Sequence, residues 1–311
     1  MRIVPAIHAR EFLITLDTLR HLLETQVPWL SKHSLRPLVP GGTDHVMVQI
    51  GDSFVARLPR HTGAVHATKV EREWLSRVAR SLSMKVPKIV YSGHHDYQYP
   101  APWSILSWVP GTPATPLDSS SLPEAGVKLA ADLAKVVMEL RSIRIPDHVG
   151  VLPQAYRTQS LSDRDPYVRA ALDQCDDVFD RGKIIEAWEH DLLAYEQWSG
   201  PPVAAHGDLQ PSNIIIDPES NAITGIIDWG GLSFGDPAVD LLPAWMLLEA
   251  SSRQTFRSLC GADEGTWRRG RAWALSIGIV AYPYYRHSRP DHTAISKRQV
   301  EQVLADVAAN A

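Results

Sequence analysis

The chain has 311 residues, of which 44% are hydrophobic and 21% are charged, and its formal net charge is −4. This length and apolar content suit one large globular domain or two lobes, whereas the slight negative charge argues against a nucleic-acid partner. No apolar stretch is long enough to cross a bilayer, and Met1–Pro5 does not resemble a signal peptide, so we expect a cytoplasmic protein without a membrane partner.

Helix and strand signals alternate over the amino-terminal third of the chain. Apolar residues at helical spacing indicate helices, and short runs with alternating or β-branched residues indicate strands. In chain order they predict a helix within 11–30, strands at 46–50 and 54–58 with a two-residue turn at 51–52 between them, a helix over 64–81, and strands at 87–93 and 102–109.

A glycine-containing loop, Gly41-Gly42-Thr43, precedes the first of these strands. Because glycine has no side chain, backbone N–H groups in such a loop can closely approach an anion such as a phosphate. Two adjacent glycines between strands are also common in ordinary hairpins. The loop by itself therefore does not distinguish a phosphate site from a simple turn.

The breaker cluster Pro110-Gly111-Thr112-Pro113 is the strongest one before a series of helices, so we place a domain boundary there, between 1–109 and 110–311. Beyond it, acidic residues outnumber basic ones between Asp173 and Glu196. Such a surface would attract a cationic substrate, although a solvated helix face explains it equally well. The helices are predicted at 122–143, 165–179, 182–198, from Asp236-Pro237 through 248, 266–285 and 295–310.

The segment from His206 to Trp229 carries most of the chemical information. It contains His206-Gly207-Asp208, then Asn213 five residues after the aspartate, then Asp228. Phosphoryl transfer needs one carboxylate at the attacking hydroxyl and ligands for the metal ion that neutralises the nucleotide phosphates. Asp208 suits the first task. Asn213 and Asp228 suit the second, because Mg²⁺ prefers oxygen ligands.

The spacing of these residues has a structural explanation. The isoleucines at 214–216 and 226–227 flank the turn residues 217–221, which predicts a hairpin. Asn213 enters its first strand and Asp228 leaves its second. We therefore expect both metal ligands to lie close together, near the loop that holds Asp208.

Three motifs together resemble the aminoglycoside phosphotransferase and choline kinase family, which includes macrolide phosphotransferases: His206-Gly207-Asp208 with Asn213, Ile227-Asp228-Trp229, and Phe234–Leu241. Protein kinases carry arginine where this chain has Gly207 and phenylalanine where it has Trp229. The resemblance is thus to the branch that acts on small molecules. It implies an α+β, two-lobed, protein-kinase-like fold with a small amino-terminal lobe containing an antiparallel sheet, a mainly helical carboxy-terminal lobe, and a cleft between them.

The resemblance also implies a nucleotide-binding lobe, 1–109, and a catalytic and substrate-binding lobe, 110–311. In the first lobe the glycine-containing loop would cover the phosphates, and the backbone of Ser107, Trp108 and Val109 would hydrogen-bond the purine base. Because backbone groups rather than side chains would recognise the base, the sequence leaves both ATP and GTP open as the nucleotide.

Family members have a strand lysine that contacts the phosphates and pairs with a glutamate on the following helix. Here Arg57 occupies the matching position, since no lysine lies nearby, and arginine can grip phosphate in bidentate fashion. Arg60 is a competitor for this role. We expect Glu73 to be the partner rather than Glu71, because Glu73 lies beside the apolar stripe of its helix. Simple solvent exposure remains an alternative for both glutamates.

The function implied is transfer of the γ-phosphoryl group of ATP or GTP, with Mg²⁺, to a hydroxyl group of an antibiotic, in the first place a cationic aminoglycoside. Alternatives are a macrolide or other antibiotic kinase, a metabolic kinase for a choline-like or sugar-like alcohol, and a non-catalytic nucleotide-binding protein. Both a monomer and a homodimer are compatible with the sequence.

Overall fold

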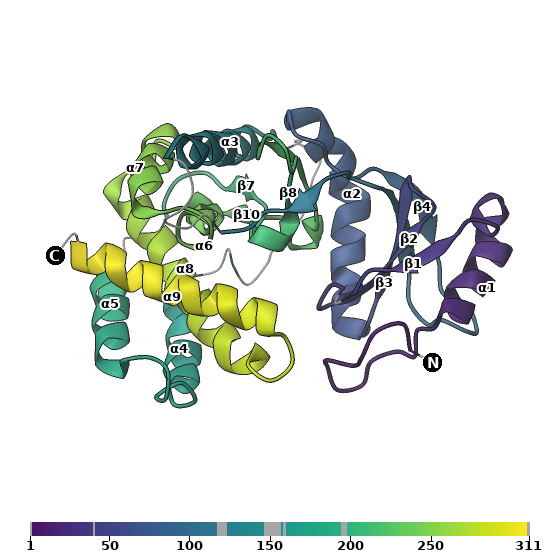
Figure 1. Ribbon diagram of the computed structural model, residues 1–311, viewed down its shortest axis with the longest axis horizontal. Coiled ribbons are helices and arrows are strands. Elements are labelled where there is room, and N and C mark those ends of the chain that lie inside the picture. The colour runs from purple at the N-terminus through teal and green to yellow at the C-terminus, as the bar shows by residue number, and fades with distance from the viewer. Residues whose placement is uncertain are drawn as a thin grey trace. The chain divides into compact units, whose positions relative to one another are not determined.

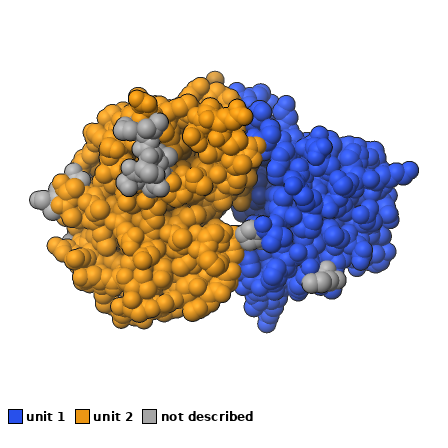
Figure 2. All heavy atoms as spheres, viewed as in Figure 1, with its two compact units in different colours: residues 1–80, 85–110 blue, residues 81–84, 111–311 orange. Residues whose placement is uncertain are grey.

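The computed structural model of the protein describes residues 2–39, 41–116, 123–145, 157, 160–193 and 198–309. The chain separates into two compact units: unit 1 comprises residues 1–80 and 85–110, and unit 2 comprises residues 81–84 and 111–311 (Figure 2). None of the helices in the described ranges combines the length and hydropathy that a bilayer crossing requires.

Unit 1 contains a five-stranded antiparallel sheet with the strand order β1-β2-β3-β5-β4. Helices α1 and α2 lie on opposite sides of this sheet (Figure 1). The elements of unit 1 are α1 (Leu16–Gln26), η1 (Pro28–Leu30), β1 (Leu35–Pro37), β2 (His45–Ile50), β3 (Phe54–Pro59), η2 (Thr62–Ala64), α2 (Val65–Ser81), β4 (Ile89–Gly93) and β5 (Trp103–Ser107).

The two faces of β3 have different environments. Ala56 and Leu58 belong to a hydrophobic core that also contains Leu19 and Leu22 of α1. Because side chains alternate along a strand, Arg57 points to the opposite face, which α2 covers. The sheet therefore separates an apolar layer under α1 from a layer under α2 that contains a buried charge.

Unit 2 is mainly helical and contains two small sheets, β10-β7 and β6-β8-β9 (Figure 1). Its elements are β6 (Thr112–Pro113), α3 (Pro123–Arg141), η4 (Leu161–Arg164), α4 (Asp165–Leu172), α5 (Arg181–Leu193), β7 (Val203–Ala205), η5 (Pro211–Asn213), β8 (Ile214–Ile216), β9 (Ile223–Ile226), η6 (Trp229–Gly231), β10 (Ser233–Gly235), η7 (Pro237–Leu241), α6 (Pro243–Met246), α7 (Ala250–Leu259), α8 (Glu264–Tyr285) and α9 (Pro290–Ala309).

Two local predictions are wrong. The loop between β2 and β3 has three residues, 51–53, because Ile50 pairs with Phe54. Such a loop commonly contains one left-handed residue, and Gly51 has a φ of 54°. The segment after Asp236 is not one continuous helix but the 3₁₀ helix η7 followed by the single turn α6. Pro243 is the first residue of α6 and lacks the N–H that a continuous helix would need there.

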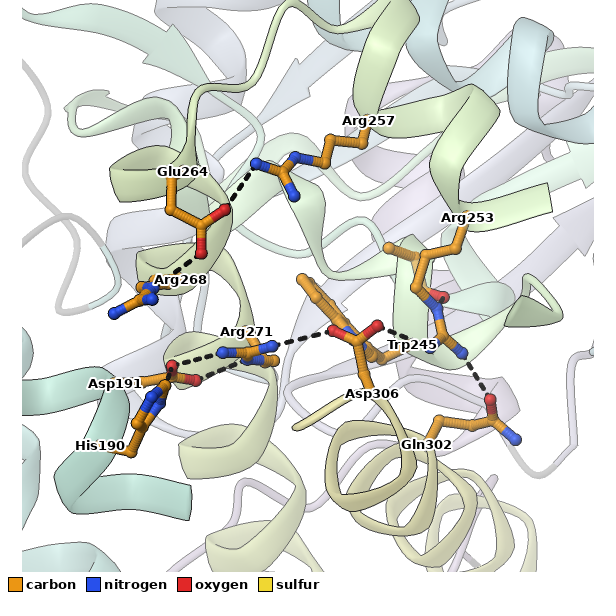
Figure 3. A network of polar contacts seen from close by, with 11 residues as sticks. His190, Asp191, Trp245, Arg253, Arg257, Glu264, Arg268, Arg271, Gln302 and Asp306 are labelled. Atoms are coloured by element: carbon orange, nitrogen blue, oxygen red, sulfur yellow. Dashed lines mark hydrogen bonds and ion pairs between the residues drawn. The ribbon is translucent and has the colours of Figure 1, made fainter. Parts of the chain in front are cut away.

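Buried charges join α5, α6, α7, α8 and α9 of unit 2 (Figure 3). Arg271 on α8 donates to both carboxylate oxygens of Asp191 on α5, at 2.7 and 2.6 Å, and to Asp306 on α9 at 3.2 Å. Asp306 also accepts from Arg253 on α7 and Trp245 on α6, both at 3.3 Å. Because these charges are buried and mutually paired, loss of one partner would leave another uncompensated.

Candidate active site

A buried carboxylate holds the loop that carries the predicted catalytic aspartate. Asp240 on η7 accepts the backbone N–H of His206 at 2.7 Å and that of Gly207 at 2.8 Å. Burial raises the pKa of Asp240, and the two backbone hydrogen bonds act in the opposite direction. Asp240 therefore fixes the start of the loop through the backbone.

His206 braces the same loop from inside. Its Nε2 lies 3.0 Å from the carbonyl oxygen of Ile227, and its Nδ1 accepts the backbone N–H of Asp208 at 3.1 Å. This pattern assigns the neutral tautomer with the proton on Nε2. The imidazole also packs against the Trp229 ring, with centroids 4.5 Å apart. The histidine of the motif thus links the loop that holds Asp208 to the end of the β8–β9 hairpin.

Gly207 is the residue at which the chain turns. Its φ is 77°, in the left-handed region, and a Cβ atom there would lie 2.9 Å from the carbonyl oxygen of Gly231. Only glycine has the conformational freedom and the small size that this position requires.

The side chain of Asp208 is held by three neighbours and remains 25% exposed. Asn213 Nδ2 donates to its Oδ2 at 3.1 Å, and Gln210 Nε2 donates to the same oxygen at 3.0 Å. Arg157 donates to Oδ1 of Asp208, and also to the carbonyl oxygen of Gly207 at 2.7 Å. The carboxylate is thus oriented while one part of it is accessible. No sequence motif marks Arg157, which lies far from the loop in the chain.

Asn213 and Asp228 lie at the same end of the β8–β9 hairpin. Ile214 pairs with Ile226, and the N–H of Ile227 donates to the carbonyl oxygen of Asn213 at 2.9 Å. The predicted hairpin is confirmed, and Asp228 is the next residue. Its φ of 65° and ψ of 64° are left-handed, a conformation that is rare outside glycine and that clusters at functional sites.

In unit 1 the loop Gly41-Gly42-Thr43 is fixed by side chains from elsewhere. Gly41 has a φ of 75°, and a Cβ atom there would lie 2.8 Å from the carbonyl oxygen of Leu38. The carbonyl of Gly42 accepts from Arg60 Nη1 at 3.2 Å, and the carbonyl of Thr43 lies 3.1 Å from His8 Nε2. Arg60 is therefore a structural residue of this loop.

Arg57 pairs with Glu71, and the prediction of Glu73 is wrong. Arg57 Nε lies 3.1 Å from Glu71 Oε2, and the two side chains are 5% and 1% exposed. At about 3.6 residues per turn, the buried face of α2 runs through Thr68, Glu71 and Leu75, whereas Glu73 is on the exposed face. The apolar stripe read from the sequence, Val70, Trp74 and Val78, is buried as predicted, but the buried face extends from it toward Glu71 and not toward Glu73.

Two of the three residues whose backbone was predicted to bind the base have their N–H groups in hydrogen bonds within unit 1. The N–H of Ser107 donates to the carbonyl oxygen of Lys88 at 2.9 Å, and that of Trp108 donates to the carbonyl oxygen of Ser53 at 2.8 Å. Among the residues that the structure describes, the N–H of Val109 has no hydrogen-bond partner.

A unit built on an antiparallel sheet, and a mainly helical unit with a His-Gly-Asp loop and an Asp-Trp-Gly turn, define the class of kinase-like phosphotransferases. Residues 36–273 match the phosphotransferase enzyme family, and the chain belongs to this family. The resemblance noted in the sequence and the predicted α+β kinase-like fold are confirmed.

Relatives and solved structures agree with this assignment. The chain is 30% identical to an aminoglycoside 3'-phosphotransferase of Streptomyces ribosidificus, over 67% of this chain and 81% of that protein. It is also 30% identical to an aminoglycoside 3'-phosphotransferase of Streptomyces fradiae, over 57% of this chain and 62% of that protein.

Among solved structures, a GDP and kanamycin complex of the aminoglycoside phosphotransferase APH(2'')-IIIa has a similar fold. Its TM-score is 0.72 at 19% identity, and the match covers 94% of this chain and 99% of that one. A macrolide 2'-phosphotransferase of type I has a TM-score of 0.61 at 20% identity, covering 92% and 98%. These identities establish the shared fold.

Proposed function

We propose that this phosphotransferase moves the γ-phosphoryl group of ATP or GTP to a hydroxyl group of a small-molecule antibiotic, in the first place an aminoglycoside. The observation that carries the proposal is the carboxylate of Asp208, which is oriented by Asn213, Gln210 and Arg157 and is still partly exposed. The relatives from two Streptomyces species, both aminoglycoside 3'-phosphotransferases, support the choice of acceptor.

Asp208 accepts a hydrogen bond from the acceptor hydroxyl and takes its proton as the oxygen attacks the γ-phosphorus. The bond between that phosphorus and its bridging oxygen breaks, and the electron pair leaves with the nucleoside diphosphate. Asn213 keeps the carboxylate in its reactive orientation, and Asp240 keeps the loop backbone in place. Positioning of this kind supplies much of the rate acceleration in phosphoryl transfer.

The nucleotide is assigned to residues 1–109. Arg57 contacts its phosphates, with Glu71 setting the direction of the guanidinium group. The loop Gly41-Gly42-Thr43 covers the phosphates with backbone N–H groups. The N–H of Val109, which has no partner among the described residues, donates to the purine base.

Asn213 and Asp228 would hold Mg²⁺. The donor set fits this ion, because both residues offer hard oxygen ligands and the Nδ2 of Asn213 is already used on Asp208, so that Oδ1 is the atom left for a cation. When bound, the ion would neutralise charge on the nucleotide phosphates.

The charges in unit 2 favour a second candidate, an acceptor with few or no ammonium groups, such as a macrolide or a sugar-like alcohol. The guanidinium group of Arg157 forms an ion pair with the carboxylate of Asp208, so a positive charge already lies beside that carboxylate. The acidic segment that sequence reasoning offered as a cation-attracting surface is extensively paired. Its described ion pairs include Asp173 with Arg181, Asp177 with Arg286, Glu189 with Arg169, and Asp191 with Arg271.

The purified protein, supplied with ATP or GTP and Mg²⁺, is tested against aminoglycosides, macrolides, and choline-like and sugar-like alcohols. We expect one class to gain the mass of one phosphate. Asp208→Asn should lower turnover by about 10² or more, whereas Glu219→Gln, in the exposed turn of the same hairpin, should not. Near-normal turnover of Asp208→Asn would remove that residue from its role. Nucleotide binding without any product would favour a non-catalytic protein.

A further inference from the structure

A second group of ligating side chains lies in unit 1, apart from the residues assigned to phosphoryl transfer. His8 comes from the amino-terminal loop, Asp44 directly precedes β2, and His61 lies between β3 and η2. Their ligand atoms all lie within 4.8 Å of one another. Three segments that are distant in sequence therefore bring two imidazoles and one carboxylate together.

Both distances from Asp44 Oδ1 to the histidine nitrogens match the edges of a metal coordination tetrahedron. Oδ1 of Asp44 lies 3.5 Å from His8 Nε2 and 3.3 Å from His61 Nε2, and the carbonyl oxygen of Thr43 lies 3.1 Å from His8 Nε2. Zinc binds such atoms at about 2.0–2.2 Å, so two ligands of a tetrahedral ion are about 3.3–3.5 Å apart. The two distances to Asp44 Oδ1 are therefore those expected between ligands of one tetrahedral ion, and all three ligand atoms lie within 4.8 Å of one another.

Hydrogen bonding accounts for only part of this arrangement. His61 Nε2 is close enough to Asp44 Oδ1 for a hydrogen bond, at 3.3 Å, whereas His8 Nε2, at 3.5 Å from the same oxygen, lies beyond the usual N–H···O range of about 2.7–3.2 Å. Both rings also approach the same oxygen atom, Oδ1 of Asp44, as ligands around one ion would. The imidazole rings are 4.7 Å apart in an edge-to-face arrangement.

The two histidines are held in place before any ion binds. The backbone N–H groups of Ile7 and His8 donate to Oε1 of Glu11, at 2.7 and 2.8 Å, and Arg60 Nη2 lies 3.1 Å from its Oε2. The ring of His61 packs over Gly63, where a Cβ atom would lie 3.0 Å from Nδ1. Because the side chains are already ordered, the entropic cost of binding an ion is smaller.

The cluster is also accessible. The side chains of His8 and His61 are 20% and 24% exposed, and that of Asp44 is 55% exposed. An ion can therefore enter from solvent. Imidazole ligands select zinc and its first-row neighbours over magnesium, which prefers oxygen ligands only.

We propose that His8, Asp44 and His61 bind one Zn²⁺ ion, with the carbonyl oxygen of Thr43 as the fourth ligand. On binding, Nε2 of His8 exchanges its hydrogen bond with Thr43 for coordination. The ion fastens the amino-terminal loop to the loop Gly41-Gly42-Thr43. If that loop covers the nucleotide phosphates, as proposed above, zinc lowers the KM for nucleotide by ordering it.

The binding test uses the full chain, freed of metal with a chelator and then titrated with Zn²⁺ in a calorimeter without nucleotide or acceptor. We expect one ion per chain, a higher Tm with zinc, and visible absorption typical of a tetrahedral site when Co²⁺ replaces zinc. His61→Ala and Asp44→Asn should each weaken binding by about 100-fold or more, since even residues that only support a ligand cost about 10–100-fold.

His95→Ala is the matched control, because this histidine is exposed in the same unit after β4. Its zinc affinity should equal that of the wild type. Absence of saturable zinc binding by the folded wild-type chain would overturn the site, as would wild-type affinity in His61→Ala. The wild-type titration and the cobalt spectrum remain decisive even if a variant fails to fold.

A separate assay measures the KM for nucleotide with and without zinc. Zinc should lower it in the wild type and leave it unchanged in His61→Ala. An unchanged wild-type KM together with normal zinc binding would overturn the link to the loop. Because binding is measured without turnover, failure of the proposed reaction would not be mistaken for failure of the site.

Discussion

Glu71→Gln is expected to lower both the stability of the protein and its kcat/KM for nucleotide. The substitution keeps the size of the side chain but removes the charge that faces Arg57 Nε at 3.1 Å. Both side chains are almost fully buried, with 5% and 1% exposed. Removing one partner of a buried ion pair costs about 3–5 kcal/mol, because the other charge remains uncompensated.

The first assay is chemical denaturation, in which the midpoint for Glu71→Gln should fall. The second is steady-state kinetics. Without Glu71 the guanidinium group of Arg57 is no longer directed, so we expect kcat/KM for nucleotide to drop by about 10²-fold, the effect of misplacing a positioning group.

Glu73→Gln is the control, since Glu73 lies on the exposed face of the same helix, α2. Exposed substitutions usually change stability by no more than about 0.5 kcal/mol, and nucleotide KM should be unaffected. The reverse outcome, with Glu73→Gln impaired and Glu71→Gln normal, would refute the assignment.

Further substitutions test the rest of the structure. Gly207→Ala should lower the free energy of unfolding by about 1–3 kcal/mol and reduce turnover, because the new Cβ would lie 2.9 Å from a carbonyl oxygen. Thermal unfolding and steady-state kinetics measure the two effects. Unaltered stability would argue against a strained turn at Gly207. Asp240→Asn should lower kcat by about 10²-fold, because the loop that holds Asp208 would lose its support. An unchanged kcat would contradict this role of Asp240. Asp191→Ala should destabilise the chain by about 3–5 kcal/mol, measured by denaturation, because Arg271 stays buried. Burial, with the Arg289 charge, lowers the pKa of His292 from its ordinary value of 6.5. The folded state therefore resists protonation of His292. The stability that the neutral His292 contributes is present above about pH 6.5 and is lost as the pH falls below this value. His292→Gln should therefore flatten the profile of Tm against pH.

The sequence by itself determined the family and the fold, together with the local construction of the catalytic segment. Asp208, Asn213 and Asp228 lie within one short stretch, and their relative placement follows from a turn and a hairpin. Those features depend on residue type and on the two-residue period of a strand, which can be read directly from the chain. The predicted hairpin is accordingly present, with Ile214 paired to Ile226.

Tertiary structure decided which residues meet across long separations. The choice of Glu71 over Glu73 depended on how α2 is rotated against the sheet, and an apolar stripe defines that rotation only roughly. Arg157 reaches Asp208 from a segment without a motif. The N–H groups of Ser107 and Trp108 donate to the carbonyl oxygens of Lys88 and Ser53, which lie in separate segments of the chain. Contacts of this kind depend on packing between distant segments, and the local periodicity of a sequence does not report on such packing.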